Sequence, residues 1–479
     1  MHDIGFMKAE QLSFEMQAGA TKLPNNGEVG GATAQLIHDR FRCGEDVANI
    51  VVDPNLSHDS GYFRFGSAAI CYGQYSAGPP ATRVTDSLHD AREAVAMNGY
   101  SVQVPFDPVQ VVDNLRLERY DAGRAGAKTL TSKSAVRDLY YLVRPALSIS
   151  ARKHLQRLYF RGWDRISFPK WPVDRTVEEV FEELLVLSMK SCGVRRLPFI
   201  WFWPAGARSC TIMTHDVETV VGRDHCSRLM DLDDSFGIKS SFQIVPEKRY
   251  STSETLLQEI RQRGCEINVH DLNHDGRLMC NREEFLRRVE RINRYVRQFD
   301  ARGFRSAVMY RSLNWYDALD VSYDMSMPNV AHLDPQQGGC CTVFPFSIGN
   351  ILELPVTTTQ DYSLFHILRD YSIELWKRQI SLIRQKHGLI SFLIHPDYII
   401  HETARCIYVE LLEYLCDLRA QNETWIALPR EVAAWWKARS ELNLVKQGSA
   451  WRVEGEGSER ARLAFAVLAN DKVTYEFDK

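Results

Sequence analysis

Long hydrophobic runs are missing from this sequence, and its first residues carry no export signal. A membrane-spanning helix requires about 18 or more consecutive apolar residues, and no segment approaches that length. The amino-terminal stretch MHDIGFMKAEQLSFEMQ lacks the basic-then-apolar pattern of a secretory signal peptide. We therefore expect a cytoplasmic protein without a membrane span.

Excess charge of either sign is also small. The 58 basic and 61 acidic residues leave a formal net charge of -3. Such a balance creates no global field that would attract nucleic acid, so we expect no nucleic-acid partner. The 11 cysteines are an odd number without CxxC spacing, which indicates reduced thiols rather than a disulfide framework.

Internal repeats and low-complexity tracts are absent too, and the rest of the composition is that of an ordinary globular protein. Hydrophobic residues make up 45% and charged residues 25% of the 479 positions. This length exceeds one ordinary domain, so we predict several packed units. They are an N-terminal α+β accessory unit (1–125), a helical linker region packing on the main unit (126–204), a large α/β unit (205–440) and a small C-terminal β element (441–479).

Within the predicted linker region, residues 136–163 alternate apolar and aromatic residues with arginines and lysines. One interpretation is a surface helix that packs on the main unit. The other is a basic amphipathic segment that makes peripheral contact with a membrane surface. The first is the more common origin of such a pattern.

From Cys210 onward, strand-like and helical patterns alternate regularly. Helical runs such as Glu283 to Phe299 and Tyr408 to Ala420 separate the apolar runs TIMTHDV, KSSFQIVP, CEINVH, FRSAVMYR, DVSYDMS, ILELPV, LISFLIHP and TWIALP. Alternation of this kind over about 220 residues predicts a parallel α/β architecture. Polar residues end several of these strands, and in a barrel the carboxyl ends of the strands form the catalytic rim.

Two carboxylates end the first of these strands. Because side chains alternate along a strand, Asp216 and Glu218 point the same way while Val217 points into the packing. Such a pair can divide labour, one carboxylate binding a cation and the other acting as a base. An N-cap pair for the following helix explains the same residues equally well. His215 faces the opposite way and is expected to be structural.

Three histidines follow strands in the same half of the chain. His270 and His274 come after CEINV, and imidazoles four residues apart share one face of a helical turn, which suits joint coordination of a Zn²⁺-like ion. His395 follows ISFLI and could protonate an amine leaving group during amide hydrolysis. In isolation, each is as readily a histidine satisfied by its neighbours. The others, His225, His332 and His366, we expect to be structural or surface residues.

Arg311 ends the predicted strand AVMYR and could pair with a carboxylate on the rim, keeping it ionised. An ordinary surface ion pair is an equal explanation. The segment SLNWYD that follows resembles no sugar-binding loop, and within it Asn314 and Trp315 are the candidate substrate-binding residues.

The ordered set THDVE, HDLNH, YRSLNW and LIHPD resembles the polysaccharide deacetylase family (NodB-like, carbohydrate esterase family 4) over about residues 205 to 435. The resemblance implies a distorted (β/α)7 barrel, a TIM-like barrel, with a divalent metal that is usually zinc. It also implies removal of acetyl groups from N-acetylated sugars.

Carried over by motif, the resemblance implies catalytic and metal-binding roles for seven residues. Asp216 is similar to the catalytic base, Arg311 to the arginine that holds it, His395 to the general acid and Asp324 to the aspartate that tunes this acid. Glu218, His270 and His274 are similar to the metal ligands. The family has two adjacent aspartates where Val217 separates Asp216 from Glu218 here, so Asp216 remains an alternative metal ligand.

These observations lead us to expect a metal-dependent hydrolase that removes an N-acetyl group from an amino sugar. A cytoplasmic location would favour a nucleotide-linked or lipid-linked sugar as its substrate. One alternative is an amidase or imidase that uses the same site on a non-sugar C–N bond. Another is a non-catalytic scaffold in polysaccharide biosynthesis, although retention of the whole set of ligands and the acid argues against it. The sequence does not predict the oligomeric state.

Overall fold

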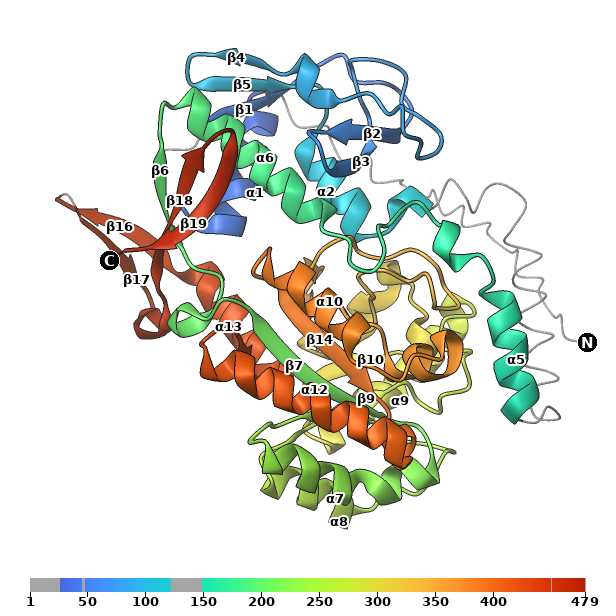
Figure 1. Cartoon of the computed structure of the whole chain (residues 1–479). Helices are drawn as coiled ribbons and strands as arrows, with labels where there is room; N and C mark the ends of the chain where they lie inside the picture. The colour runs from blue at the N-terminus through green and yellow to red at the C-terminus, as the bar shows by residue number, and fades with distance from the viewer. Residues whose placement is uncertain (1–25, 45–47, 122–148, 449, 479) are drawn as a thin grey trace, which may run out of the picture.

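Seven parallel strands form the centre of the described part of the chain (Figure 1). The computed structural model describes residues 26–44, 48–121, 149–448 and 450–478. In sheet order the parallel strands are β13 (Ile351–Glu353), β11 (Tyr323–Asp324), β10 (Gly303–Arg305), β9 (Glu266–His270), β8 (Ser241–Ile244), β7 (Cys210–Val217) and β14 (Leu389–Ile394). The short strand β15 (Trp425–Ile426) also pairs with β7, and β12 (Phe346–Ile348) runs antiparallel to β13.

Every residue of β7, β8, β9 and β14 is buried, which accounts for their nearly continuous apolar sequences. The helices that follow these strands cover the sheet, with α8 and α9 in contact with β9 and α10 in contact with β14. The helices of this unit are α7 (Val220–Ser235), α8 (Glu254–Gln262), α9 (Arg282–Gln298), α10 (Glu374–Arg384), α11 (Pro396–Ile399), α12 (Glu402–Ala420) and α13 (Pro429–Glu441).

The two edges of this curled sheet are not joined by a strand ladder within the described residues. Isolated hydrogen bonds cross the opening instead, including one from the backbone N–H of Thr358 to the carbonyl oxygen of Ser391 at 3.3 Å. The hydroxyl of Thr357 donates to the carbonyl oxygen of Leu389 at 2.8 Å, and the hydroxyl of Thr358 donates to that of Ser391 at 2.8 Å. The predicted mixed α/β class is therefore confirmed, whereas the closed (β/α)7 barrel is not.

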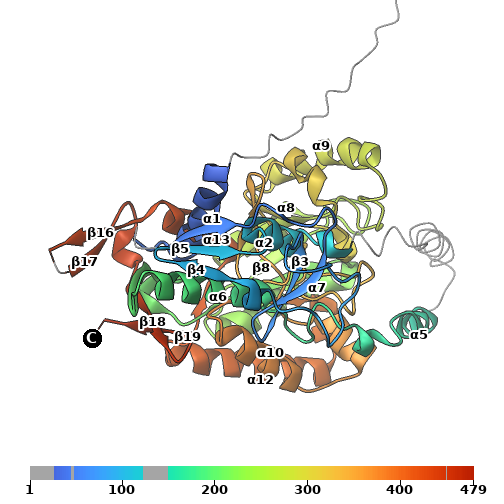
Figure 2. The ribbon, with the colours of Figure 1, turned by 90° about the horizontal axis from the view of Figure 1, so that it is seen from above.

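An α+β unit precedes the sheet and lies above it in Figure 1 and in front of it in Figure 2. A three-stranded sheet of order β1-β5-β4 and the hairpin β2–β3 pack with α1, α2 and α6. The elements of this unit are α1 (Asn26–Phe41), β1 (Asn49–Val52), β2 (Gly61–Phe65), β3 (Ala69–Gly73), η1 (Ala91–Ala94), β4 (Ala96–Asn98), β5 (Ser101–Val104), α2 (Pro108–Arg116) and η2 (Arg119–Asp121).

The predicted linker region contains helices α5 (Ile149–Tyr159) and α6 (Thr176–Ser191), the turn η4 (Trp163–Arg165) and one strand, β6 (Arg196–Ile200). Strand β6 pairs with β18 (Leu463–Ala469), which in turn pairs with β19 (Lys472–Phe477). Strands β18 and β19 therefore form one antiparallel sheet with β6, the strand that comes before β7 in the sequence. The hairpin of β16 (Asn443–Gln447) and β17 (Ala450–Glu454) projects from the molecule in both views (Figures 1 and 2).

One hydrophobic core runs through these parts. Its buried members include Phe63 and Phe106 of the N-terminal unit, Leu184 of α6, and Ile212 and Phe392 of the large sheet. A second cluster lies between β8, β9, α8 and α9. Because the first cluster is continuous, the N-terminal unit and the large sheet share a core, and the boundaries at 125, 204 and 440 stay predictions.

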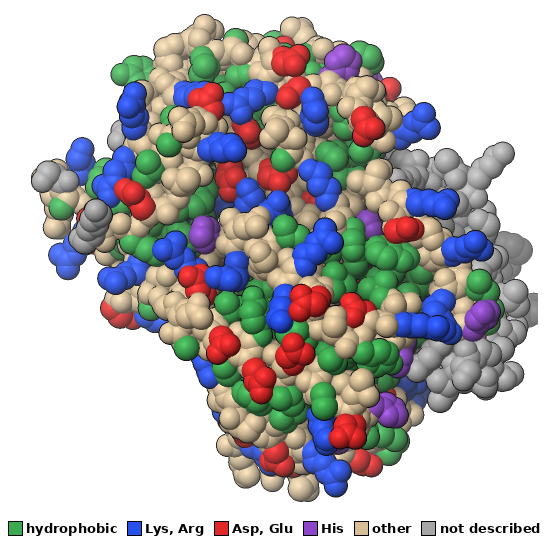
Figure 3. All heavy atoms as spheres, viewed as in Figure 1, with side chains coloured by type: hydrophobic (Ala, Val, Ile, Leu, Met, Phe, Trp, Pro, Cys, Tyr) green, Lys and Arg blue, Asp and Glu red, His purple; other side chains and the backbone are tan. Residues whose placement is uncertain are grey.

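The face of the molecule shown in Figure 3 agrees with the balanced composition. On the face shown in Figure 3, Lys and Arg side chains are interspersed with Asp and Glu side chains. That face therefore offers no broad basic area of the kind that binds nucleic acid. Among the described residues, no helix combines the length and the apolar character needed to cross a membrane.

A substitution at Gly303, the first residue of β10, tests how tightly the sheet is packed. A Cβ atom on Gly303 would lie 2.2 Å from Cε2 of Tyr323, a fully buried ring on the neighbouring strand. We expect Gly303→Ala to lower the free energy of unfolding by about 3 kcal/mol, because overpacking a core displaces backbone or side chains. Urea denaturation measures this change. Ser322→Ala, at an exposed position beside the same strands, should change stability by less than about 0.5 kcal/mol, and equal effects would contradict the packing argument.

Candidate metal centre

Five polar side chains meet where β7, β9 and β14 end. Parallel strands present their carboxyl ends at one edge, and Ile394 of β14 lies in register with His215 of β7. This brings together Asp216, Glu218, His270, His274 and His395, all singled out from the sequence. The alternation along β7 is confirmed, since Val217 packs in the second hydrophobic cluster while its neighbouring carboxylates face the histidines.

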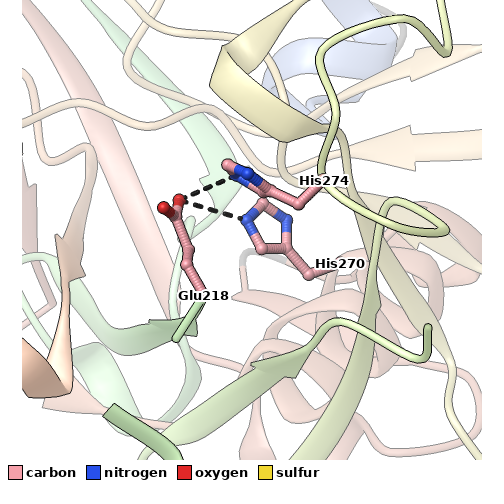
Figure 4. A group of neighbouring side chains, drawn as sticks. All are labelled: Glu218, His270 and His274. Carbon is pink, nitrogen blue, oxygen red and sulfur yellow. Dashed lines mark ion pairs between the residues drawn. The ribbon is translucent and has the colours of Figure 1, made fainter. Parts of the chain in front are cut away.

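Glu218, His270 and His274 point toward one another (Figure 4). Oε1 of Glu218 lies 2.9 Å from Nε2 of His274 and 3.5 Å from Nε2 of His270. One potential ligand atom from each residue lies within 4.8 Å of the others. This is a spacing that a single metal ion could bridge, and two imidazoles with one carboxylate form a donor set that zinc accepts.

The two imidazoles are prepared for a ligand. Nδ1 of His270 lies 3.0 Å from the carbonyl oxygen of Arg305, so it carries the proton and donates it. In the neutral ring the lone pair of His270 then lies on Nε2, which faces Glu218. Nε2 of His270 and Nε2 of His274 are both buried and form no well-oriented hydrogen bond, although Oε1 of Glu218 lies 3.5 Å and 2.9 Å from them. Buried nitrogen atoms in this state are costly unless something binds them, so the residues fit a metal ion.

The loop after β9 differs from the predicted helical turn. His270 is the last residue of the strand, and His274 lies in an irregular loop. Asp271 and His274 adopt positive φ angles of 54° and 50°. Such conformations are uncommon for residues other than glycine and often occur at functional sites. The imidazoles therefore meet, with ring centroids 4.8 Å apart, through a tight loop rather than along a helix face.

Asp216 is bound by an arginine that the sequence analysis did not identify. Nη1 of Arg305 donates to Oδ1 of Asp216 at 2.6 Å and to the hydroxyl of Thr214 at 2.9 Å. Nε of Arg305 donates to the carbonyl oxygen of Met325 at 2.9 Å. Burial alone would raise the pKa of Asp216, but the charges of Arg305 and then of the neighbouring histidines hold it below its ordinary value.

The predicted pairing of Arg311 with a carboxylate of this site is wrong. Arg311 is buried, and its Nε donates to Oε2 of Glu118 at 2.6 Å while its Nη2 donates to Oε1. The predicted strand FRSAVMYR in fact ends at Arg305 and continues into the turn η6 (Ala307–Met309), where Val308 has a φ of 60°. That turn carries Arg311 away from Asp216 and toward the N-terminal unit.

His395 is held by an aspartate that was also missed. Nδ1 of His395 lies 2.6 Å from Oδ1 of Asp361, and its backbone N–H donates to Oδ2 of the same residue at 2.7 Å. Nε2 lies 3.3 Å from Oε1 of Glu218. Burial would lower the pKa of His395, but Asp361 first and then Glu218 raise it well above its ordinary value.

The predicted role of Asp324 in tuning this histidine is wrong. Asp324 accepts hydrogen bonds from the backbone N–H of Ser326 at 3.0 Å and from its hydroxyl at 2.7 Å. Its pKa is raised, mainly by burial, and that of the adjacent Glu353 is raised well above its ordinary value by burial and by Asp324. The available signal for Asp361 was its position in TTTQDYS, which follows the strand-like run ILELPV.

A cavity of about 150 Å³ opens beside these residues. Asp216, Glu218, His274 and His395 form its polar end. The rest of the wall is mostly apolar or aromatic and comes from Phe160, Val308, Met309, Leu333, Pro335, Tyr362, Leu393 and Tyr398. The predicted substrate-binding residues Asn314 and Trp315 are not part of this wall. Asn314 is exposed, and Trp315 packs on Phe285 of α9 with ring centroids 5.6 Å apart.

The remaining histidines agree with their predicted structural roles. His215 is fully buried on the far side of β7, with Nε2 3.0 Å from Oδ2 of Asp233. His332 places Nε2 2.9 Å from the carbonyl oxygen of Pro169. His366 lies edge-on to the rings of Tyr362 and Tyr398. His225, in α7, is partly buried.

The end of α5 borders the same cavity. Phe160 packs with Leu333 and Ile367, and Gln156 also lines the wall. This agrees with the interpretation of a helix packed on the main unit. The opposite face exposes Leu155, Leu158 and Tyr159 by 43%, 54% and 48%. Positions 136–148 of the basic segment lie outside the described residues, and contact of this segment with a membrane stays a prediction.

No protein-family model and no curated protein matches this chain. Solved structures of polysaccharide deacetylases do. One, from Mycobacterium smegmatis and provisionally assigned as a polysaccharide deacetylase, is 16% identical over 52% of this chain and 98% of its own, with a TM-score of 0.41. The carbohydrate esterase family 4 domain of a xylanase from the hindgut metagenome of Trinervitermes trinervoides is 12% identical over 48% and 92%, with a TM-score of 0.31. The peptidoglycan deacetylase PdaC of Bacillus subtilis is 12% identical over 48% and 93%, with a TM-score of 0.31.

The ion pair between Arg311 and Glu118 should contribute to the stability of the fold. Glu118→Gln would leave a buried guanidinium without its countercharge, so we expect the free energy of unfolding to fall by about 3 kcal/mol. Glu476→Gln is a matched control, because Glu476 pairs with Arg196 on the surface, and it should cost less than about 1 kcal/mol. Chemical denaturation of both variants provides the comparison, and a cost for Glu118→Gln no larger than that of the control would refute the assignment.

Proposed function

We propose that this protein is a metal-dependent hydrolase that removes the acetyl group from the nitrogen of an N-acetylated amino sugar. The observation that carries the proposal is the convergence of two pre-oriented pairs on one donor set. Asp216 with Arg305 and His395 with Asp361 both face Glu218, His270 and His274 across the same cavity. A base, an acid and a metal position on one cavity wall are the groups that amide hydrolysis requires.

Glu218, His270 and His274 would hold the ion. When bound there, a divalent metal such as Zn²⁺ supplies Lewis acidity, which makes water easier to deprotonate and draws electron density from an amide carbonyl. Glu218 is the better carboxylate ligand of the two, because its Oε1 faces the Nε2 atoms of His270, His274 and His395. Burial would raise the pKa of Glu218, but His274 and the other imidazoles hold it well below its ordinary value, so it stays ionised.

Asp216 would act as the base. Its Oδ1 is bound by Arg305, which fixes the orientation of the carboxylate and keeps it ionised. Oδ2 lies on the side of His270, 3.6 Å from Nε2, and is therefore the oxygen that can accept a proton from water beside the metal ligands. This division of roles follows from the different partners of the two carboxylates.

His395 would deliver a proton to the leaving nitrogen. Asp361 binds Nδ1, so the ring is oriented with Nε2 toward the cavity. A proton on Nε2 can pass to the amine as the C–N bond breaks, and without that proton the amine is a poor leaving group. Asp361 therefore acts as a positioning residue, in the way that a carboxylate holds the histidine of a hydrolytic triad.

The most specific part of the proposal is the identity of the substrate, namely an acetyl group on the nitrogen of a sugar. The ordered motifs that resemble polysaccharide deacetylases support them, and the same residues could also open the C–N bond of a non-sugar amide or cyclic imide. Both substrate classes therefore belong in the first assay.

The decisive assay follows product release from purified protein loaded with Zn²⁺. Acetate release from UDP-N-acetylglucosamine and from N-acetylglucosamine oligosaccharides should depend on the metal and should stop on addition of EDTA. Ring opening of hydantoin and dihydrouracil tests the imidase alternative. Protein that binds no divalent ion and hydrolyses none of these substrates would instead favour a non-catalytic scaffold.

Two variants separate the metal ligands from the acid. His270→Ala should lose both metal and activity, because it removes a nitrogen of the donor set. His395→Ala should retain bound zinc and lose turnover by about 10²-fold or more. Metal analysis of the purified variants and initial rates provide the two readouts. Full turnover in His395→Ala would remove this residue from the mechanism.

Asp361 and Asp324 test the assignment of the positioning residue. Asp361→Asn should lower kcat by about 10²- to 10⁴-fold while KM and zinc content change little, because the amide favours the wrong tautomer of His395. Asp324→Asn should leave kcat within about threefold of the unmodified protein, since burial already favours its neutral form. The ratio of the two kcat values is the measurement. A larger loss in Asp324→Asn would reverse the assignment.

A further inference from the structure

A second and larger cavity lies at the opposite end of the large sheet. Its volume is about 1040 Å³. Arg302, Tyr323 and Leu352 border it where β10, β11 and β13 begin, whereas the candidate metal centre lies where strands end. Residues of α1, α2, α6 and α13 complete the wall, so the N-terminal unit forms one side of this cavity. In Figure 1, α1 lies above α13 on this side of the molecule.

The lining of this cavity is strongly basic. Six of its described lining side chains are cations and two are acids. Both acids are already engaged: Asp39 lies 3.8 Å from Arg42 and accepts from Gln35 at 2.6 Å, and Glu431 accepts from the backbone N–H of Leu428 at 2.8 Å. The cations are Arg40, Arg42, Arg116, Arg302, Arg430 and Lys437. The whole chain has a formal net charge of -3, so this excess of positive charge is local to the cavity and does not reflect the overall composition.

Two of these arginines have buried guanidinium nitrogen atoms that form no hydrogen bond. Arg40 is only 7% exposed, and its Nε and Nη1 are buried without a hydrogen-bond partner. Nε of Arg116 is buried in the same state. Within the described ranges, neither side chain has an ion-pair partner. Buried guanidinium N–H groups without hydrogen-bond acceptors are costly, and an anion that accepts from both arginines would satisfy them.

The nearby carboxylates, Glu178 and Asp113, act on these arginines through their charge but form no ion pair with them within the described residues. The guanidinium of Arg40 stacks on Phe344, with Cζ 3.5 Å from the ring centroid. Glu178 influences both arginines, but its carboxylate accepts hydrogen bonds from the hydroxyl of Thr342 and from the backbone N–H of Val343. Burial, together with the charge of Arg116, lowers the pKa of Arg40 to about 10, so Arg40 still carries its charge at neutral pH.

The rest of the wall suits an organic group. Phe181, Phe346, Trp436, Leu36 and Leu352 provide apolar surface beside the two arginines. Arg116 lies over the rings of Phe181 and Phe346, with Cζ 5.6 Å and 5.5 Å from their centroids. A free inorganic ion would leave this surface and most of the volume unused. Planar guanidinium groups bind phosphate oxygens well, and aromatic walls bind flat rings.

We propose that this cavity is a binding site for an organic phosphate of nucleotide size, with the phosphate between Arg40 and Arg116 and the organic group against Trp436 and Phe346. The site is separate from the candidate metal centre and does not depend on the proposed hydrolase activity.

The test is isothermal titration calorimetry on the full chain with ADP, pyrophosphate and adenosine as probes. ADP should bind saturably and at least tenfold more tightly than adenosine, because the phosphates carry the contact with the arginines. ADP should also bind more tightly than pyrophosphate, because only ADP uses the apolar wall. Absence of saturable binding by both ADP and pyrophosphate at 1 mM, an order of magnitude above about 0.1 mM affinities, would overturn the proposal.

Variants identify the site. Arg40→Gln and Arg116→Gln should each weaken ADP binding at least tenfold, and Arg116, which is only partly buried, keeps the test valid if Arg40→Gln does not fold. Arg83→Gln, on an exposed part of the same N-terminal unit, is the matched control and should bind ADP normally. His270→Ala should bind ADP normally as well, which separates this site from the metal centre. Unchanged ADP affinity in folded Arg116→Gln would place the nucleotide elsewhere and refute the site.

Discussion

The convergence of three imidazole nitrogen atoms on one partly buried carboxylate oxygen is the arrangement on which the site depends. Oε1 of Glu218 has the Nε2 atoms of His274, His395 and His270 at 2.9, 3.3 and 3.5 Å. The three imidazoles come from the end of β9, the loop that follows it and the residue after β14, so this oxygen is the point at which these segments meet. The Nε2 atoms of His270 and His274 form no well-oriented hydrogen bond there, and a cation between them and Glu218 would bind all three residues.

Two supporting contacts fix the orientation of the Asp216 carboxylate and of the His395 ring. Arg305 binds one oxygen of Asp216 and leaves the other facing the histidines, while Asp361 binds Nδ1 of His395 and leaves Nε2 facing the cavity. Both supporting residues are buried, so their orientation is fixed by packing and hydrogen bonds before any substrate binds. Pre-organisation of this kind reduces the reorganisation that the reaction itself requires.

The sequence was sufficient to single out four residues at or next to strand ends, because a period of two along β7 and an abrupt change from apolar to polar residues are local signals. His274 was singled out by its spacing from His270, although it lies in a loop rather than on a helical turn. The sequence was insufficient for Arg305, because the early end of β10 has no clear signal in the sequence, and for Asp361, which lies in an irregular segment. The run FRSAVMYR is apolar enough to look like one strand, but β10 stops after three residues and positive φ angles at Val308 and Met309 redirect the chain. Arg311 therefore meets Glu118, about two hundred positions earlier in sequence, a contact without any local signature.

The same limit applies to the fold. Alternating strand and helix patterns predict the parallel α/β class, but barrel closure depends on whether the two edge strands meet, and here hydroxyls of Thr357 and Thr358 contact β14 in place of a ladder. The pairing of β6 with β18 joins positions more than 260 residues apart. The basic cavity likewise gathers residues of α1, α2 and α13 that show no shared pattern along the chain.

The most direct test of the central claim is the position of the metal itself. Crystals grown with Zn²⁺ should be measured on both sides of the zinc absorption edge. One strong anomalous peak should lie between Glu218, His270 and His274, at about 2.0 to 2.2 Å from each ligand atom. No anomalous peak at these residues in fully zinc-loaded crystals would contradict the account.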